Sequence, residues 1–236
     1  MSSPPNVAAI VVAAGRGERA GGGMPKQFRP IGGVPMLLRT LRPFLASPLV
    51  DLVVVVLPPA VAAEPPAWLA PLLGDRLVAV AGAEERMGSV ECGLAALPAG
   101  ISVVAVHDGA RPFVSGTVID AVIAAARAGT GAIAAVPVAD TIKAAVPAER
   151  PGTFAIGRTV PRDDLWRAQT PQAFPVRLLR RALAAARGAG RFVTDEASAV
   201  EALGEPVLLV PDRTTNLKVT TEEDFGVAEA IARGNP

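Results

Sequence analysis

The sequence predicts an α/β fold: a Rossmann-like, doubly wound and mostly parallel sheet with a projecting β-hairpin arm. Two observations predict it. Short runs rich in valine and isoleucine alternate with longer segments rich in alanine and leucine, the pattern of strands covered by helices on both faces. Residues 139–172 interrupt this alternation, because they have no helical period and carry two extended runs around a turn.

The expected strands are short, continuous and apolar, as in a sheet that is buried on both faces. In chain order they are Val7–Val12, Asp51–Leu57, Leu77–Val80, Val103–His107, Ala132–Val138 and Val207–Val210. The expected helices lie between or after them, at Met36–Ala46, Ser89–Leu97, Thr117–Ala128, Val176–Arg187, Asp195–Leu203 and Thr221–Ala232. We expect residues 1–236 to form a single domain.

The predicted arm is an excursion at about residues 139–165. Thr141–Val146 and Thr153–Val160 are extended runs on either side of the turn-rich segment Pro147–Gly152. A two-stranded arm is marginally stable alone and needs a partner surface. The alternative is a long surface loop, a class that is uncommon in compact domains.

Composition excludes several classes of protein. Half of the residues are hydrophobic (50%) and 19% are charged, which indicates an ordered globular chain. With 23 basic and 22 acidic residues there is no basic excess for nucleic-acid binding. The single Cys92 excludes an intrachain disulfide and a multi-cysteine metal site, and fits a reduced, cytoplasmic setting. No apolar stretch is long enough to cross a membrane, and Val7–Ala14 is interpreted as a buried strand rather than a signal peptide.

The first predicted strand is followed by a glycine-rich, basic loop, Ala13–Arg19, and then by Pro25-Lys26-Gln27. Glycines let backbone N–H groups approach an anion, and basic side chains neutralise it, so the loop predicts phosphate binding. It is not a P-loop, because Lys26 follows a proline and precedes a glutamine. The glycine pattern of a dinucleotide-binding fingerprint matches nominally at Gly15 and Gly17. That fingerprint needs a helix to begin within the loop, which Gly21–Gly23 and a proline oppose. A nicotinamide-dependent dehydrogenase is therefore disfavoured.

Polar clusters also follow the third to sixth predicted strands. They lie at residues 82–90, 106–112, 138–143 and 214–219. The carboxyl ends of parallel strands meet at one edge of a doubly wound sheet, where such folds bind ligands. Each cluster alone could be a surface turn, but several at one edge predict an active site.

Four other side chains have structural interpretations. His107 is the only histidine and is expected to be hydrogen-bonded within the structure rather than to act as a base or ligand. Cys92 is expected to be a small buried hydrophobe in a helix. Trp166 and Phe174 are expected to pack for the arm, whereas Arg86, after a strand, is a candidate for orienting its loop.

The chain resembles the 2-C-methyl-D-erythritol 4-phosphate cytidylyltransferase family over nearly its whole length. The resemblance is carried by ordered motifs: Ala-Ala-Gly-x-Gly-x-Arg with Pro-Lys-Gln, Glu-Arg-x-x-Ser-Val, Val-His-Asp-x-Ala-Arg-Pro, Pro-Val-x-Asp-Thr-x-Lys, Leu-Trp-x-x-Gln-Thr-Pro-Gln, Thr-Asp-Glu-Ala-Ser and Asn-x-Lys-Val-Thr. The motifs at Gln169–Gln172 and Thr194–Ser198 are the more diagnostic, because other nucleotidyltransferases share the first loop but not these two. The resemblance implies cytidylyl transfer from CTP to 2-C-methyl-D-erythritol 4-phosphate in the non-mevalonate isoprenoid pathway.

The resemblance also implies roles for individual residues. Arg19, Lys26 and Lys218 match the cations that grip the triphosphate and stabilise the transition state. Nucleotide-binding positions match at Ala14, Gly15, Gly17, Gly82, Ala83, Glu84, Ser89 and Asp108, and acceptor-binding positions match at Arg111, Thr141, Arg162, Thr170 and Thr194. It implies a homodimer through the arm, with Arg162 reaching into the site of the second subunit. A Mg²⁺ ion is expected, held mainly by the CTP phosphates, and no side chain is assigned to it.

The sequence departs from the family pattern at two positions of the base-binding loop, and two other functions compete with the one that the resemblance implies. Ala83 and Glu84 stand where the family more often has glycine and aspartate, which bears on base selectivity. A related cytidylyltransferase acting on ribitol phosphate or another polyol phosphate would share the base-binding half of the site. A non-catalytic nucleotide-binding module is disfavoured, because Arg19, Lys26 and Lys218 together exceed what mere binding requires.

Overall fold

The structure is a computed structural model that describes residues 6–15, 25–150, 152–191 and 193–234. A seven-stranded sheet in the order β11-β7-β10-β6-β1-β4-β5 forms its centre. The strands are β1 (Asn6–Val12), β4 (Leu52–Leu57), β5 (Leu77–Ala81), β6 (Ile101–Asp108), β7 (Gly131–Pro137), β10 (Trp166–Pro175) and β11 (Val207–Pro211). All pair in parallel except β10, which is antiparallel to both β6 and β7, so the predicted mostly parallel sheet is confirmed.

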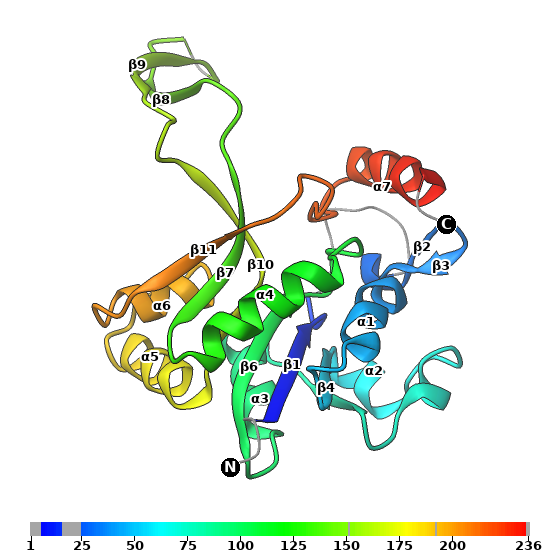
Figure 1. The fold of residues 1–236 in the computed structure, drawn as a ribbon. Helices are drawn as coiled ribbons and strands as arrows, with labels where there is room; N and C mark the ends of the chain where they lie inside the picture. The colour runs from blue at the N-terminus through cyan, green and yellow to red at the C-terminus, as the bar shows by residue number, and fades with distance from the viewer. Residues whose placement is uncertain (1–5, 16–24, 151, 192, 235–236) are drawn as a thin grey trace.

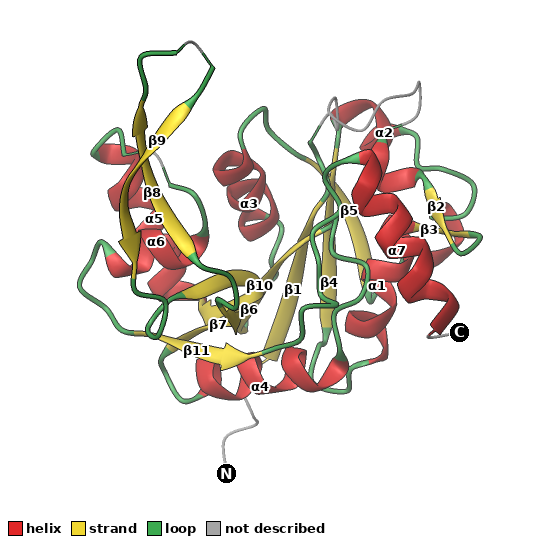
Figure 2. Ribbon diagram, turned by 90° about the horizontal axis from the view of Figure 1, so that it is seen from above, coloured by secondary structure: helices red, strands yellow, loops and turns green. Residues whose placement is uncertain are grey.

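Helices cover both faces of this sheet (Figures 1 and 2). They are α1 (Met36–Ala46), α3 (Arg86–Ala95), α4 (Gly116–Arg127), α5 (Val176–Gly188), α6 (Glu196–Glu201) and α7 (Glu222–Gly234). Side chains alternate along β1, so Ala9 and Val11 join a core with α1 and α4, while Ala8 and Ile10 join a second core with α3, α5 and α6. The two cores explain why the strands are continuously apolar.

One strand of the sheet escaped the sequence prediction. All six expected strands are present, but β10 inserts between β6 and β7, where only polar motif residues were expected. It contains Gln169, Gln172 and two prolines, and its register with β7 shifts between Ala168 and Gln172. No periodic apolar pattern marks such a strand, because its burial comes from the two neighbours that it separates.

The structure corrects two smaller expectations. Phe174 does not pack for the arm; it is fully buried in the core formed with α3 and α5, because β10 carries it between the sheet and these helices. Cys92 on α3 is half-buried rather than buried. The remaining elements are short: η2 (Lys26–Phe28), β2 (Pro30–Ile31), β3 (Val34–Pro35), α2 (Pro59–Ala63) and η3 (Ala70–Leu72).

The predicted β-hairpin arm is confirmed. Strands β8 (Ile142–Pro147) and β9 (Phe154–Val160) pair with each other in a separate two-stranded sheet. Figure 1 shows the hairpin standing away from the main sheet, beyond the ends of β7 and β10. Phe154 and Ile156 are 72% and 67% exposed. Among the described residues, no helix combines the length and the apolar character that crossing a bilayer requires.

Candidate active site

The predicted ligand edge of the sheet holds a cleft of about 480 Å³. It opens at the carboxyl ends of β1, β5 and β6, as expected for an open α/β sheet. Residues from several separate stretches of the chain line it: Val12, Ala13, Gly15, Lys26, Gln27, Ala83, Glu84, Glu85, Arg86, Ser89, Asp108, Gly109, Ala110, Lys218 and Thr220.

Asp108, the last residue of β6, is the electrostatic centre of the cleft. Its Oδ1 lies 3.1 Å from Arg86 Nη2, and its Oδ2 lies 3.0 Å from Lys218 Nζ and 3.7 Å from Arg111 Nε. Burial opposes the charged form of Asp108, but these three cations outweigh it and hold the pKa of Asp108 well below its usual range. The carboxylate is therefore ionised at any physiological pH and orders the cations around it.

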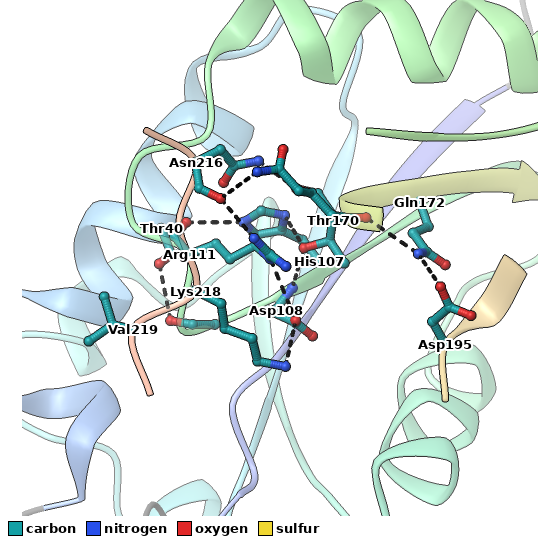
Figure 3. Close-up of polar contacts among 12 residues, drawn as sticks. Thr40, His107, Asp108, Arg111, Thr170, Gln172, Asp195, Asn216, Lys218 and Val219 are labelled. Carbon is teal, nitrogen blue, oxygen red and sulfur yellow. Dashed lines mark hydrogen bonds and ion pairs between the residues drawn. The ribbon is translucent and has the colours of Figure 1, made fainter. Parts of the chain in front are cut away.

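A buried hydrogen-bond chain beneath the cleft fixes the end of β6. Figure 3 shows His107 and Thr170 side by side near Asp108. The backbone N–H of Asp108 donates to Thr170 Oγ1 at 3.0 Å, and Thr170 Oγ1 lies 2.9 Å from His107 Nδ1. His107 Nε2 lies 3.2 Å from the Arg111 carbonyl oxygen. Because a carbonyl oxygen can only accept a hydrogen bond, the chain is complete when His107 Nε2 carries the proton and the Thr170 hydroxyl donates to Nδ1.

This arrangement confirms the structural interpretation of His107. The ring is fully buried and lies against Phe44. Burial lowers the pKa of His107 to about 4, so the neutral form is present at neutral pH. Thr170 is buried as well, and its hydroxyl is already used by this chain rather than turned into the cleft.

Asn216 brings the segment after β11 to the cleft. Its amide nitrogen donates to the Thr170 carbonyl at 2.9 Å and to Asp212 Oδ2 at 2.7 Å, and its backbone carbonyl accepts from Arg111 Nη1 at 2.7 Å. These bonds fix the residue that lies two positions before Lys218. The lysine therefore reaches Asp108 from a segment more than 100 residues further along the chain.

Lys26 and Gln27 line another part of the cleft. Lys26 Nζ donates to the Val219 carbonyl at 2.9 Å, which places it close to the segment that carries Lys218. Gln27 Nε2 donates to the carbonyls of Ala13 and Gly15 at 2.9 and 3.2 Å. Gln27, which sequence reasoning used only as part of a motif, thus ties η2 to the start of the phosphate loop. Gly17 and Arg19 of that loop lie outside the described residues.

Residues 82–89 form the wall on the β5 side. A Cβ on Gly82 would lie 2.4 Å from the Ala14 Cβ, which is too close for two carbon atoms. Only a glycine at position 82 therefore lets the two backbone segments lie this close together. Ser89 Oγ closes the loop on itself, because it accepts from the Ala83 N–H and lies within hydrogen-bond distance of the Ala83 carbonyl, both at 3.1 Å. Ala83 and Glu84 are exposed at the mouth of the cleft.

A buried ion pair joins this segment to α6, which packs on the same face of the sheet as α3. Arg86, the first residue of α3, binds Glu196 of α6 through Nη1 at 2.5 Å and Nη2 at 3.0 Å while it also contacts Asp108. Arg86 fits the predicted role of orienting its loop. Its partner Glu196, only 1% exposed, was missed as a site residue, since the two are 110 positions apart and only the acidic letters at residues 195–196 hinted at it.

Several predicted acceptor-binding residues lie away from the cleft. Thr141 and Arg162 are exposed at the base of the arm, where the Arg162 guanidinium donates to the Ala139 carbonyl. Thr194 is exposed just before α6. Arg111 lies at the back of Asp108, partly buried and engaged with Asn216. Within a single chain, the structure therefore brings together the nucleotide side of the predicted site but not all of the acceptor side.

The described residues contain no cluster of three or more histidine, cysteine, aspartate or glutamate side chains that could hold a metal ion by themselves. Asp108 is the buried carboxylate that faces the cleft, and both of its oxygens contact cations. One carboxylate is too few protein ligands to hold a metal ion alone, whereas Mg²⁺ is commonly bound by one or two carboxylates together with substrate phosphates.

An open α/β sheet with lysines and arginines gathered at its carboxyl edge defines a class of enzyme that handles nucleotides or other phosphate esters. Residues 7–234 match the family model described as 2-C-methyl-D-erythritol 4-phosphate cytidylyltransferase. The chain belongs to this family.

Individual relatives agree over almost the full length. The protein of that name from Ralstonia nicotianae is 46% identical over 239 residues, covering 96% of this chain and 91% of the relative. The one from Streptomyces coelicolor is 45% identical, covering 97% and 86%. The crystal structure of the Thermus thermophilus protein has a TM-score of 0.77 at 39% identity, covering 95% of this chain and 98% of that one. The 4-diphosphocytidyl-2C-methyl-D-erythritol synthase structure from Anaerococcus prevotii has a TM-score of 0.82 at 27% identity, with 97% and 96% covered.

Proposed function

We propose that this protein transfers a cytidylyl group from CTP to 2-C-methyl-D-erythritol 4-phosphate, giving 4-CDP-2-C-methyl-D-erythritol and pyrophosphate. The observation that carries the proposal is the meeting of Lys26, Lys218 and Asp108 in one cleft of a chain that belongs to this family. A phosphate oxygen of the acceptor attacks the α-phosphorus of CTP. The new P–O bond forms as the bond to the oxygen that bridges to the β-phosphorus breaks, and that oxygen leaves with the electron pair in pyrophosphate.

The reaction needs positioning and charge stabilisation more than acid–base chemistry. The acceptor phosphate is already ionised at neutral pH, so no strong general base is required, and negative charge increases on oxygens that are already anionic. Lys26 and Lys218 supply positive charge in the cleft, and Arg19 adds a third cation in this proposal. A Mg²⁺ ion would be held mainly by the CTP phosphates and would neutralise their charge, and Asp108 is the buried carboxylate of the cleft that could help to hold it.

The loop at residues 82–89 is the proposed reader of the cytosine base, with Ala14 and Gly15 facing it. Backbone groups that are held as rigidly as Ala83 is by Ser89 can present fixed donors and acceptors to a base edge. Asp108 lies between this loop and Lys218, which suits a contact with the ribose or with the acceptor.

The acceptor side is proposed to be completed by a second copy of the chain. Arg111 and Thr170 belong to the subunit that binds CTP, and Thr141 and Thr194 are exposed, at the base of the arm and just before α6. Arg162 of the partner would reach over on the arm and hold the acceptor phosphate, because its planar guanidinium can bind two phosphate oxygens at once. The exposed apolar face of β9 supports pairing of the two arms.

Pyrophosphate release tests this function, with each of the four ribonucleoside triphosphates measured against a panel of polyol phosphates. The proposal expects release with CTP and 2-C-methyl-D-erythritol 4-phosphate to exceed every other combination. Faster release with ribitol phosphate or another polyol phosphate would assign the chain to a related cytidylyltransferase activity. Release that does not depend on any acceptor would contradict cytidylyl transfer.

A further inference from the structure

Glu196 is a buried carboxylate that the proposed reaction does not use. It is 1% exposed and is the first residue of α6. Burying a carboxylate is costly, and a buried ion pair often contributes little net stability compared with apolar side chains of similar size. Its partner Arg86 is the first residue of α3 and lies within residues 82–89, the proposed base-reading segment, so the pair can act on base recognition.

The N-terminus of α6 is held firmly, so Glu196 is a fixed point. Asp195 caps the helix by accepting from the Ser198 N–H at 3.0 Å, and Ser198 completes the capping box. Gln172 of β10 donates to Asp195 Oδ2 at 2.8 Å (Figure 3). Its side-chain oxygen accepts from the Ala197 N–H at 3.0 Å. Residues on both sides of Glu196 are therefore anchored to the central sheet.

Glu196 and Asp108 share the guanidinium of Arg86 between them. Glu196 takes Nη1 and Nη2 through its two oxygens, while Asp108 receives Nε and Nη2 on Oδ1 alone. Asp108 Oδ2 thereby remains available to Lys218. Without the Glu196 charge, the planar fork of Arg86 would have only Asp108 to bind and would turn toward both of its oxygens. Because Arg86 is the first residue of α3, that turn would move the end of the loop at residues 82–85.

We infer that Glu196 is a positioning residue for recognition of the nucleotide base and that it acts through Arg86. The inference deepens the proposed function, since it rests on the loop at residues 82–89 facing the base. It predicts that discrimination between CTP and UTP depends on a carboxylate that touches neither nucleotide. CTP and UTP carry the same triphosphate, so any general change in cleft charge cancels in the ratio of their affinities.

The test compares binding of CTP and UTP by calorimetry, with Mg²⁺ and without acceptor. Glu196→Gln keeps the size of the side chain but removes its charge, and we expect it to lower the CTP-to-UTP affinity ratio about tenfold. Glu201→Gln is the matched control, because Glu201 is an exposed residue of the same helix, and its ratio should equal that of the wild type. The ratio is measured on folded protein only, so partial unfolding does not alter it.

A double-mutant cycle tests the route through Arg86. In an Arg86→Met background, Glu196→Gln should cause no further loss of discrimination. If Glu196→Gln does not fold, Arg86→Lys tests the same bridge, because an ammonium group lacks the fork that binds two carboxylates, and it should lower the ratio similarly.

Two results would overturn the inference: an unchanged ratio in Glu196→Gln, or an equal loss with and without Arg86. A wild-type protein that binds CTP no better than UTP would instead count against the proposed function, so the two failures are distinguishable.

Discussion

Asp108 shows how single residues determine the charge state of the cleft. Its carboxylate is buried at the end of β6, and burial alone would favour the protonated form. Three cations oppose this, because Arg86, Lys218 and Arg111 each lie within 3.7 Å of a carboxylate oxygen. Removing any one cation leaves the carboxylate less well compensated and frees the others to move. The cleft therefore responds to mutation as a network rather than as independent contacts.

Lys26 is the residue whose loss should affect chemistry most simply. Lys26→Ala removes one preorganised cation from the phosphate site and should lower turnover at saturating CTP by about 10² or more. The hydrogen bond to Val219 would also be lost, so the fold is checked by thermal unfolding. Arg233→Ala, at the exposed end of α7, is the control for removal of a positive charge. Near-normal turnover of Lys26→Ala would contradict the phosphate-site assignment.

His107 makes stability depend on pH. Its pKa is about 4 in the folded protein because of burial, against 6.5 for an unperturbed histidine. Between these values the unfolded chain binds a proton that the folded chain excludes, so the free energy of unfolding falls as pH decreases from 6.5 toward 4. A shift of this size corresponds to about 3 kcal/mol.

The measurement compares the wild type with His107→Gln by urea unfolding at several pH values. The variant lacks this proton, so any stability advantage of the wild type at pH 7 should shrink steadily down to pH 4. An advantage that stays constant across this range would show that the ring is protonated in the folded state too.

At the scale of elements, the arm carries large apolar side chains that its own chain leaves exposed. Phe154 and Ile156 lie two residues apart on β9 and face the same side. We expect the wild type to sediment as a dimer, and the variant with both residues replaced by aspartate to sediment as a monomer at the same concentration. Leu72→Asp is the matched control, because Leu72 is an exposed hydrophobic residue of the main body. An undiminished dimer would place the interface elsewhere.

The elements that could be predicted from the sequence are those with local patterns. Continuous valine runs indicated β4 and β6, and an extended pattern broken by a turn indicated the hairpin of β8 and β9. The strand β10 could not be found in this way, because its prolines and glutamines lack a strand pattern and its burial depends on β6 and β7.

The same distinction holds in the site. Asp108 ends a strand and Lys26 belongs to a basic motif that follows one, so local sequence patterns indicated both residues. The pairing of Arg86 with Glu196 spans 110 positions and follows only from how α6 lies against the sheet. Long-range ion pairs of this kind require the fold before they can be seen.

At the scale of the whole molecule, the residues predicted to bind the acceptor do not all meet within one chain. Arg162 is exposed, and its guanidinium donates to the carbonyl of Ala139 in the same chain. Arg162→Ala should raise the Michaelis constant for 2-C-methyl-D-erythritol 4-phosphate much more than that for CTP. The two Michaelis constants should respond differently because the guanidinium is proposed to bind the acceptor phosphate and not the triphosphate.

Mixing variants tests whether Arg162 serves the second subunit. After subunit exchange between Arg162→Ala and Lys26→Ala, each heterodimer contains one site with both residues intact. The mixture should then be more active than the sum of the two separate variants. Activity that never exceeds this sum, in samples with demonstrated heterodimers, would mean that Arg162 acts within its own chain.

The central claim is that the cleft joins CTP to 2-C-methyl-D-erythritol 4-phosphate through a new diphosphate bond. Phosphorus NMR of one reaction with both substrates and Mg²⁺ tests it most directly, because it identifies the bond that forms. The account predicts two coupled resonances of an asymmetric diphosphate diester that grow together with an equal amount of pyrophosphate. Substrates that stay unchanged, or CTP that is hydrolysed to orthophosphate without a new diester, would contradict it.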